Sequence, residues 1–202
     1  MLAFNLVGVS KQCAPVYGVD RYARLEMSLS KIVIFMFNKR LRPMSNSTPI
    51  ELWTDGACSP NPGPGGWAYV VLYPDGSTRE GSGFDAETTN NRQEMTAVIE
   101  GLRVVDPHLP VQVVTDSAYV MNPFTKNWVK GWEKRGWTRR GEDGKPAELK
   151  NADLWRALAA EVGSHQVCWR HVKGHVGHVL NERCDRLAVA ERHRAFVSAV
   201  LR

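Results

Sequence analysis

The order of apolar runs between residues 50 and 196 constrains the fold more than any other feature of the sequence. Three strand-like runs come first, at residues 50–54, 67–73 and 78–84, and a turn at residues 74–77 joins the second to the third. Helix-like and strand-like patterns then alternate along the rest of this region. This order predicts an α/β fold in which helices flank a five-stranded mixed sheet of three antiparallel strands followed by two parallel ones.

The later elements are predicted from hydrophobic spacing. Thr89 is a candidate cap for a helix whose apolar residues recur at intervals of three and four. Those residues are Met95, Val98, Ile99, Leu102 and Val105. A continuous apolar run at residues 111–115 predicts a strand buried on both faces. The remaining expected elements are helices near 117–124, 127–135 and 151–163, a strand at 166–172 and a last helix at 181–195.

Residues 1–49 lack a sustained helical or strand period and end in a polar, turn-rich run. One interpretation makes Met44 the native start, so that residues 1–43 are upstream sequence that is not translated. The other makes these residues a basic arm that helps to hold nucleic acid. We expect an N-terminal extension over 1–49 that is disordered or not native, a folded domain over 50–196 and a C-terminal tail over 197–202.

The formal net charge of +5 does not by itself indicate a nucleic-acid partner. Residues 1–43 hold seven Lys and Arg against two acids, and the rest of the chain is electrically balanced. Evidence for a nucleic-acid role must therefore be local. The four cysteines lack the spacing of a metal site and predict free thiols in a reducing compartment. The apolar run at 32–37 is too short to span a bilayer, so we expect a cytoplasmic protein without a membrane partner.

Four acidic residues are the candidate functional groups: Asp55, Glu94, Asp116 and Asp185. Asp55 and Asp116 each follow an apolar strand, so parallel neighbouring strands would place their carboxylates side by side. Glu94 begins a helix, and Asp185 shares a helix face with Asn181. Each acid alone is more commonly a turn residue, a helix cap or a solvated helix residue. Together they indicate a buried carboxylate site, which needs a cation such as Mg²⁺ or Mn²⁺ and is typical of phosphodiester hydrolysis.

Short motifs surround these acids and continue along residues 50–195. They are Thr-Asp-Gly-Ala-Cys (54–58), Asn-Pro-Gly-Pro-Gly-Gly-Trp (61–67), Thr-Thr-Asn-Asn-Arg-Gln-Glu (88–94), Thr-Asp-Ser (115–117), Lys-Asn-Ala-Asp-Leu-Trp (150–155), Val-Lys-Gly-His (172–175) and Asn-Glu-Arg-Cys-Asp (181–185). In order and spacing they resemble the type 1 ribonuclease H family, and closely its bacterial members, the ribonucleases HI. No single one of these motifs would be specific.

The resemblance implies an endonuclease that hydrolyses the RNA strand of RNA–DNA hybrids, with a role in removing RNA primers and R-loops. Residues 50–196 would be its catalytic domain, and the protein would be a monomer. Asp55, Glu94, Asp116 and Asp185 would hold two Mg²⁺ ions, which Mn²⁺ could replace, and the products would carry 5′-phosphate and 3′-hydroxyl ends. His175 would act as a catalytic proton carrier, because its ordinary pKa lies near neutrality. His178 has the plainer role of supporting the same loop.

The resemblance also implies a substrate-binding surface. Residues 126–150 hold eight basic residues against four acids, with Trp128, Trp132 and Trp137 interleaved. These could be a solvated face and packed aromatic rings, but the family places its basic protrusion here, which includes Lys134 and Arg135 and grips DNA phosphates. By the same resemblance, the remaining contacts are Asn61, Asn90 and Asn91 in the minor groove of the hybrid, and Thr89 and Asn151 on a DNA phosphate.

The sequence departs from well-known bacterial members near these contacts. Glu87 stands where an Arg often completes the phosphate pocket, and Ala118 stands where Gln is frequent. Val179-Leu180 replaces a usual Pro-Glu. None of these changes touches a carboxylate. The alternatives are another ribonuclease H-like enzyme, such as an integrase-like or junction-resolving nuclease, and a non-catalytic hybrid-binding protein. The flanking motifs argue against the first, and the four intact carboxylates argue against the second.

Overall fold

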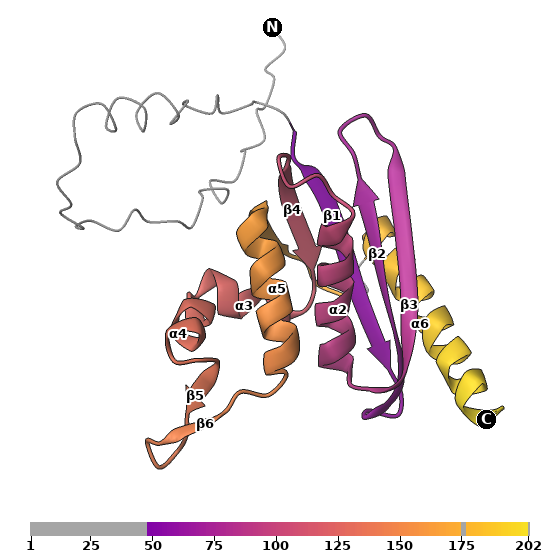
Figure 1. The fold of residues 1–202 in the computed structure, drawn as a ribbon. Coiled ribbons are helices and arrows are strands. Elements are labelled where there is room, and N and C mark those ends of the chain that lie inside the picture. Colours follow the sequence, from indigo (N-terminus) through magenta and orange to yellow (C-terminus); the bar gives the residue numbers. More distant parts are fainter. Residues whose placement is uncertain (1–47, 175–176, 202) are drawn as a thin grey trace, which may run out of the picture. The chain divides into compact units, whose positions relative to one another are not determined.

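The computed structural model describes residues 48–174 and 177–201. Their main feature is a five-stranded sheet with the strand order β3-β2-β1-β4-β7 (Figure 1). The strands are β1 (Ile50–Cys58), β2 (Gly63–Leu72), β3 (Thr78–Thr88), β4 (Pro110–Thr115) and β7 (Gln166–His171). β1, β2 and β3 pair in antiparallel fashion, whereas β4 runs parallel to β1 and β7 runs parallel to β4. The predicted mixed sheet is confirmed.

Helices cover both faces of the sheet. They are α2 (Asn90–Arg103), α3 (Ala118–Thr125), α4 (Trp128–Lys134), α5 (Ala152–Ser164) and α6 (Val179–Val200). α2 and α5 lie together on one face and α6 lies on the other (Figure 1). Successive residues of β1 point to opposite faces of the sheet. Leu52 packs in the core beneath α2 and α5, whereas Trp53 packs with Cys184 of α6. Both faces of the central strand β1 are therefore buried.

β1 and α6 are among the elements that extend beyond their predicted bounds. β1 continues past residue 54 because its antiparallel pairing with β2 extends to Cys58 opposite Gly65, whereas its parallel pairing with β4 ends at Trp53 opposite Val114. α6 begins at Val179 and continues through residues 197–200, beyond the expected end at 195. Phe196 and Val197 are more than half exposed there, so no buried apolar face marks this last turn.

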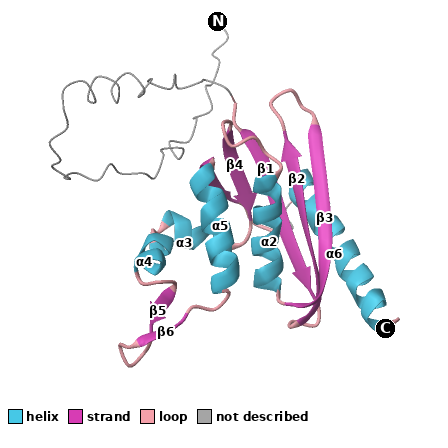
Figure 2. Cartoon of the chain, viewed as in Figure 1, coloured by secondary structure: helices cyan, strands magenta, loops and turns pink. Residues whose placement is uncertain are grey.

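A second, two-stranded sheet was not predicted. It consists of β5 (Thr138–Arg140) and β6 (Pro146–Glu148), which form a hairpin beyond α4 (Figure 2). Each strand has three mostly exposed residues without apolar alternation, so the period that reveals a half-buried strand is absent. The hairpin extends the basic segment 126–150 away from the main sheet. Among the described residues, no helix is both long and apolar enough to span a membrane.

Candidate active site

Strand register places Asp55 beside Asp116. The last parallel pair between β1 and β4 is Trp53 with Val114, and Asp55 and Asp116 each follow two residues after these. The two carboxylates therefore leave neighbouring strands at the same level. Asp55 lies within β1 and is buried, whereas Asp116 follows the end of β4 and is half-buried. The parallel arrangement that was predicted from the sequence brings these two acids together.

Close packing of α2 against β1 adds Glu94 to the pair. A Cβ atom at Gly56 would collide with the backbone nitrogen of Glu94 and would lie 2.6 Å from the carbonyl carbon of Gln93. Glycine at this position therefore allows the first turn of α2 to lie directly on the strand. As a result, carboxylate oxygens of Asp55, Glu94 and Asp116 all lie within 4.8 Å of one another.

Asp185 lies on α6, at the wall of the cleft that the other three acids line. It is half-buried and is not part of the group within 4.8 Å. Asn181, one helical turn earlier, is 1% exposed, and its Oδ1 atom has no hydrogen-bond partner among the described residues. The structure thus brings three of the four predicted acids to ligand distance and places the fourth beside them.

The pKa values of two acids reflect this crowding. Burial and the negative charges of Asp116 and Asp185 together raise the pKa of Asp55 to about 7, although a hydrogen bond from the backbone N–H of Gly56 (2.7 Å) opposes the rise. Burial, followed by the charges of Asp55 and Asp116, raises the pKa of Glu94 well above its ordinary value. The carboxylates therefore resist ionisation unless a positive charge joins them.

The chemistry of this group fits a divalent cation. Carboxylate oxygens are hard ligands of the kind that Mg²⁺ and Mn²⁺ prefer. Oε2 of Glu94 is buried and has no hydrogen-bond partner in the part of the chain that the structure describes. An unpartnered buried oxygen is costly, and a bound cation would satisfy it. Asp55, Glu94 and Asp116 are thus the candidate ligands, with Asp185 close by.

The loop after β7 approaches the site directly. A Cβ atom at Gly174 would collide with Oδ2 of Asp116, so the backbone passes against this carboxylate. The Nε2 atom of His171 donates a hydrogen bond to the backbone oxygen of Asp116 (3.0 Å). His171 was not among the predicted site residues, because no motif in the sequence includes it. His175 lies outside the described residues. The ring of His178 packs on Trp53, with 5.9 Å between the ring centroids.

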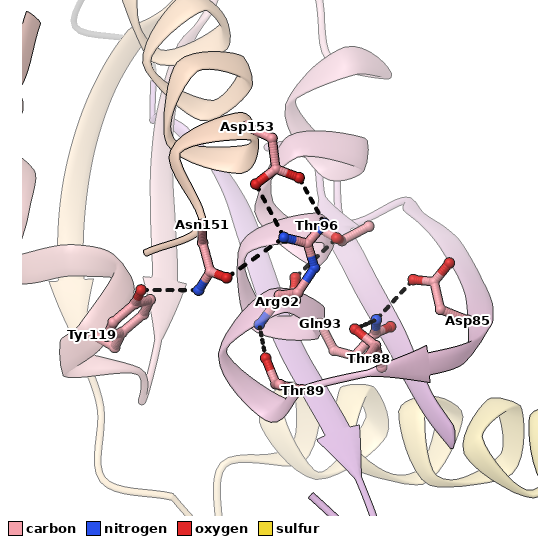
Figure 3. A network of polar contacts seen from close by, with 9 residues as sticks. All are labelled: Asp85, Thr88, Thr89, Arg92, Gln93, Thr96, Tyr119, Asn151 and Asp153. Atoms are coloured by element: carbon pink, nitrogen blue, oxygen red, sulfur yellow. Dashed lines mark hydrogen bonds and ion pairs between the residues drawn. The ribbon is translucent and has the colours of Figure 1, made fainter. Parts of the chain in front are cut away.

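A polar network surrounds Arg92 at the start of α2 (Figure 3). Its guanidinium donates two hydrogen bonds to Asp153 (3.0 and 2.7 Å) and one to Oδ1 of Asn151 (3.5 Å). Its backbone N–H donates to Oγ1 of Thr89, the N-cap of α2 (3.4 Å). The amide of Asn151 donates to the hydroxyl of Tyr119 (3.1 Å). Arg92 therefore connects Thr89 and Asn151, the two residues predicted to hold a DNA phosphate.

The other predicted contacts divide into exposed and packed groups. Oδ1 of Asn61 accepts a hydrogen bond from the backbone N–H of Asn90 (3.3 Å), and Asn90 lines the cleft while Asn91 is half-buried nearby on α2. Trp128 is 46% exposed, and the ammonium group of Lys126 lies over its ring. Trp132 and Trp137 pack against the core.

The basic side chains Lys134 and Arg135 are exposed beside these tryptophans. The exposed ring of Trp128 and the cationic side chains near it are thus accessible to a ligand. The packed rings of Trp132 and Trp137 instead hold α4 and the hairpin in place.

Fold and site together define a protein with a group of carboxylates at the edge of a mixed sheet that could hold a metal ion, and comparison with known proteins identifies the family. The family model for RNase H matches residues 47–193. Ribonuclease H of Granulibacter bethesdensis is 48% identical over 146 residues, which cover 72% of this chain and 93% of that protein. Ribonuclease H of Paracoccus denitrificans is 52% identical over 142 residues, 68% and 88% of the two chains.

A solved structure agrees with these relatives. LC9-RNase H1, described as a type 1 RNase H with the type 2 active-site motif, superposes with a TM-score of 0.63 and 31% identity over 74% of each chain. The chain belongs to the ribonuclease H family, as its motifs predicted.

Proposed function

We propose that this protein is an endonuclease that hydrolyses the RNA strand of RNA–DNA hybrids. The observation that carries the proposal is the group of Asp55, Glu94 and Asp116, whose oxygens lie within 4.8 Å of one another at the edge of the sheet. Membership of the ribonuclease H family supplies the substrate. A role in removing RNA primers and R-loops, action as a monomer and a cytoplasmic location belong to the same proposal.

The four acids have distinct positions in the proposed mechanism. Asp55, Glu94 and Asp116 hold divalent cations, and Asp185 completes the set from the wall of the cleft. If two Mg²⁺ ions, or Mn²⁺ in their place, were held by these residues, they would supply an activated water for hydrolysis and charge stabilisation for the leaving oxygen. His175 carries a proton to or from the reacting oxygens. The products have 5′-phosphate and 3′-hydroxyl ends.

Substrate binding is proposed to use the surfaces on either side of the carboxylates. Thr89 and Asn151 contact a DNA phosphate, and Arg92 holds them together. The charge of Arg92 is itself paired with Asp153, so Arg92 orients this pocket, and residue 87, where this chain has Glu, adds no positive charge to it. Asn61, Asn90 and Asn91 contact the minor groove, where 2′-hydroxyl groups distinguish RNA from DNA. Trp128, Trp132, Trp137, Lys134 and Arg135 form the basic protrusion that binds the DNA strand.

Hydrolysis of a labelled RNA–DNA hybrid in the presence of Mg²⁺ tests this function. The wild type should cut the RNA strand, and Asp55→Asn and Asp116→Asn should each lower kcat by about a thousandfold or more, because each removes a ligand charge. Asp106→Asn is the matched control, since Asp106 is exposed in the loop before β4, at the end of that strand opposite to Asp116, and it should keep full activity.

Two outcomes would contradict the proposal. Equal activity of the wild type and the two site variants would overturn the assignment of the metal ligands. Cleavage of duplex DNA in place of the hybrid would favour an integrase-like nuclease. Repeating the assay with a chelator should abolish the activity, and added Mg²⁺ or Mn²⁺ should restore it.

A further inference from the structure

One arginine lines the acidic cleft that holds the four carboxylates. Arg192 lies on α6 one turn after Val189 and two turns after Asp185, and all three residues line the cleft. Their spacing of four and three residues places them on one face of the helix. Among the described residues that line this cleft, Arg192 is the only basic one. No motif in the sequence distinguishes it from the other arginines of the helix.

Small residues hold this part of α6 close to the sheet. A Cβ atom at Gly66 would collide with the carbonyl oxygen of Ala188 and would lie 2.6 Å from the backbone nitrogen of Arg192. Ala188 is fully buried against Ala57 and Ala68 of β1 and β2. The helix backbone therefore has little freedom to move at this point. The base of the Arg192 side chain is fixed at the mouth of the cleft.

The charge of Arg192 reaches the cleft wall. Burial raises the pKa of the Cys58 thiol, whereas a hydrogen bond involving Gly63 and the positive charge of Arg192 lower it. Cys58 lines the same cleft as the carboxylates. This effect agrees with the position of Arg192 in the lining of the cleft that also contains Cys58.

Arg192 also differs from the neighbouring arginines of α6 in the groups that its side chain contacts. Arg183 forms an ion pair with Glu80 (2.8 Å), and Arg194 forms one with Glu191 (2.9 Å). Within the described ranges, Arg192 has no ion pair with a carboxylate, and its guanidinium contacts the ring of His193 at 3.4 Å. Its positive charge is thus available to an anion that enters the cleft.

We propose that Arg192 binds a phosphate of the cleaved RNA strand, next to the phosphate that is hydrolysed. This inference rests on the proposed function, because the carboxylates must face the strand that is cut. The other charged residues that line the cleft are all acidic and repel a polyanion, so a cation beside them favours binding of the substrate strand. A guanidinium suits this purpose, because its planar set of donors matches two oxygens of one phosphate.

Kinetics of hybrid hydrolysis at two salt concentrations and constant Mg²⁺ test the proposal. Arg192→Gln should lower kcat/KM about tenfold at low salt, mainly through a higher KM. Loss of one phosphate contact reduces the salt slope by about one unit, so the deficit should shrink about threefold to fourfold between roughly 50 and 200 mM salt. Arg192→Lys, which keeps the charge, should recover most of the lost affinity.

The matched control is Arg186→Gln, which removes the same charge from an exposed position of α6 outside the cleft lining. It should leave both KM and the salt slope at the wild-type values. A wild-type salt slope in Arg192→Gln, or equal effects of the two variants, would overturn the role of Arg192 while leaving the proposed function intact. A wild type that does not cleave the hybrid would overturn both.

Discussion

Arg92 and Glu94 are two residues apart on the first turns of one helix, yet they lie in opposite electrostatic environments. Arg92 is surrounded by acceptors and forms a bidentate ion pair with Asp153. Glu94 is buried beside two other acids and leaves one oxygen without a partner among the described residues. The Arg92 network is satisfied within the protein, whereas the carboxylate group is complete only with a ligand. Paired charges hold α2 in place, and unpaired charges on the same helix form the site.

The contrast depends on how closely α2 approaches β1. Gly56 allows the backbone of the strand to lie against the first turn of the helix, which brings Glu94 to Asp55. On the other side of the same turn, Arg92 reaches Asp153 at the start of α5. A change in this spacing should therefore affect the unpaired carboxylates much more than the flexible ion pair.

Among the changes that leave every carboxylate in place, substitution of Gly56 should have the largest effect on activity. In Gly56→Ala the new methyl group collides with the backbone of Glu94, so α2 must shift and the carboxylates separate. We expect kcat for hybrid hydrolysis to fall about a hundredfold, the size that follows from an ångström-scale misplacement of reacting groups. Single-turnover rates would measure the fall.

Gly163→Ala is the control for the preceding variant. Gly163 lies near the end of α5, and a Cβ atom there would meet no atom within 4 Å. This variant should keep full activity and gain about 0.5 kcal/mol in the free energy of unfolding. Full activity in Gly56→Ala would show that the close contact between β1 and α2 does not determine the geometry of the site.

Removal of one carboxylate should stabilise the protein in the absence of metal. In a chelating buffer at about pH 8, Asp55→Asn relieves repulsion within the acidic group and should raise the free energy of unfolding by about 1 to 3 kcal/mol. Added Mg²⁺ should stabilise the wild type more than the variant, because the variant lacks one ligand. Thermal melts with and without Mg²⁺ would measure both effects. A lower melting temperature for the metal-free variant would contradict the expectation.

The same variant should change the pH dependence of stability. The pKa of Asp55 rises from its ordinary value of 3.8 to about 7 in the folded protein. Between these values the folded state keeps a proton that the unfolded state has released, so metal-free stability should decrease as pH rises from about 4 to about 7. Glu94 shifts in the same direction, so the slope in Asp55→Asn should be shallower but not zero. Equal slopes would show that Asp55 is not the titrating group.

The sequence predicted the carboxylate group much better than the Arg92 network. The strand order and the positions of Asp55 and Asp116 follow from local apolar runs, because strands that are buried on both faces have nearly continuous apolar sequences. The Arg92 network depends on the docking of α5 against α2, which no local pattern encodes. Arg192 is likewise one of several arginines on α6, and only the packing of that helix on Gly66 reveals which face it occupies.

Loss of the ion pair between Arg92 and Asp153 should have the smallest effect on stability. The side chains of Arg92 and Asp153 are 35% and 60% exposed, so solvent screens their attraction. Asp153→Asn should lower the free energy of unfolding by about 0.5 kcal/mol, the opposite sign to Asp55→Asn, and the loss should shrink in high salt. Asp143→Asn is the control, because its pair with Lys145 is longer (3.6 Å) and more exposed, and it should change stability still less. Denaturant unfolding of both variants would measure the difference. A stability gain in Asp153→Asn would mean that the charges around Arg92, like those around Glu94, are uncompensated. The contrast between the satisfied Arg92 network and the incomplete carboxylate group would then be wrong.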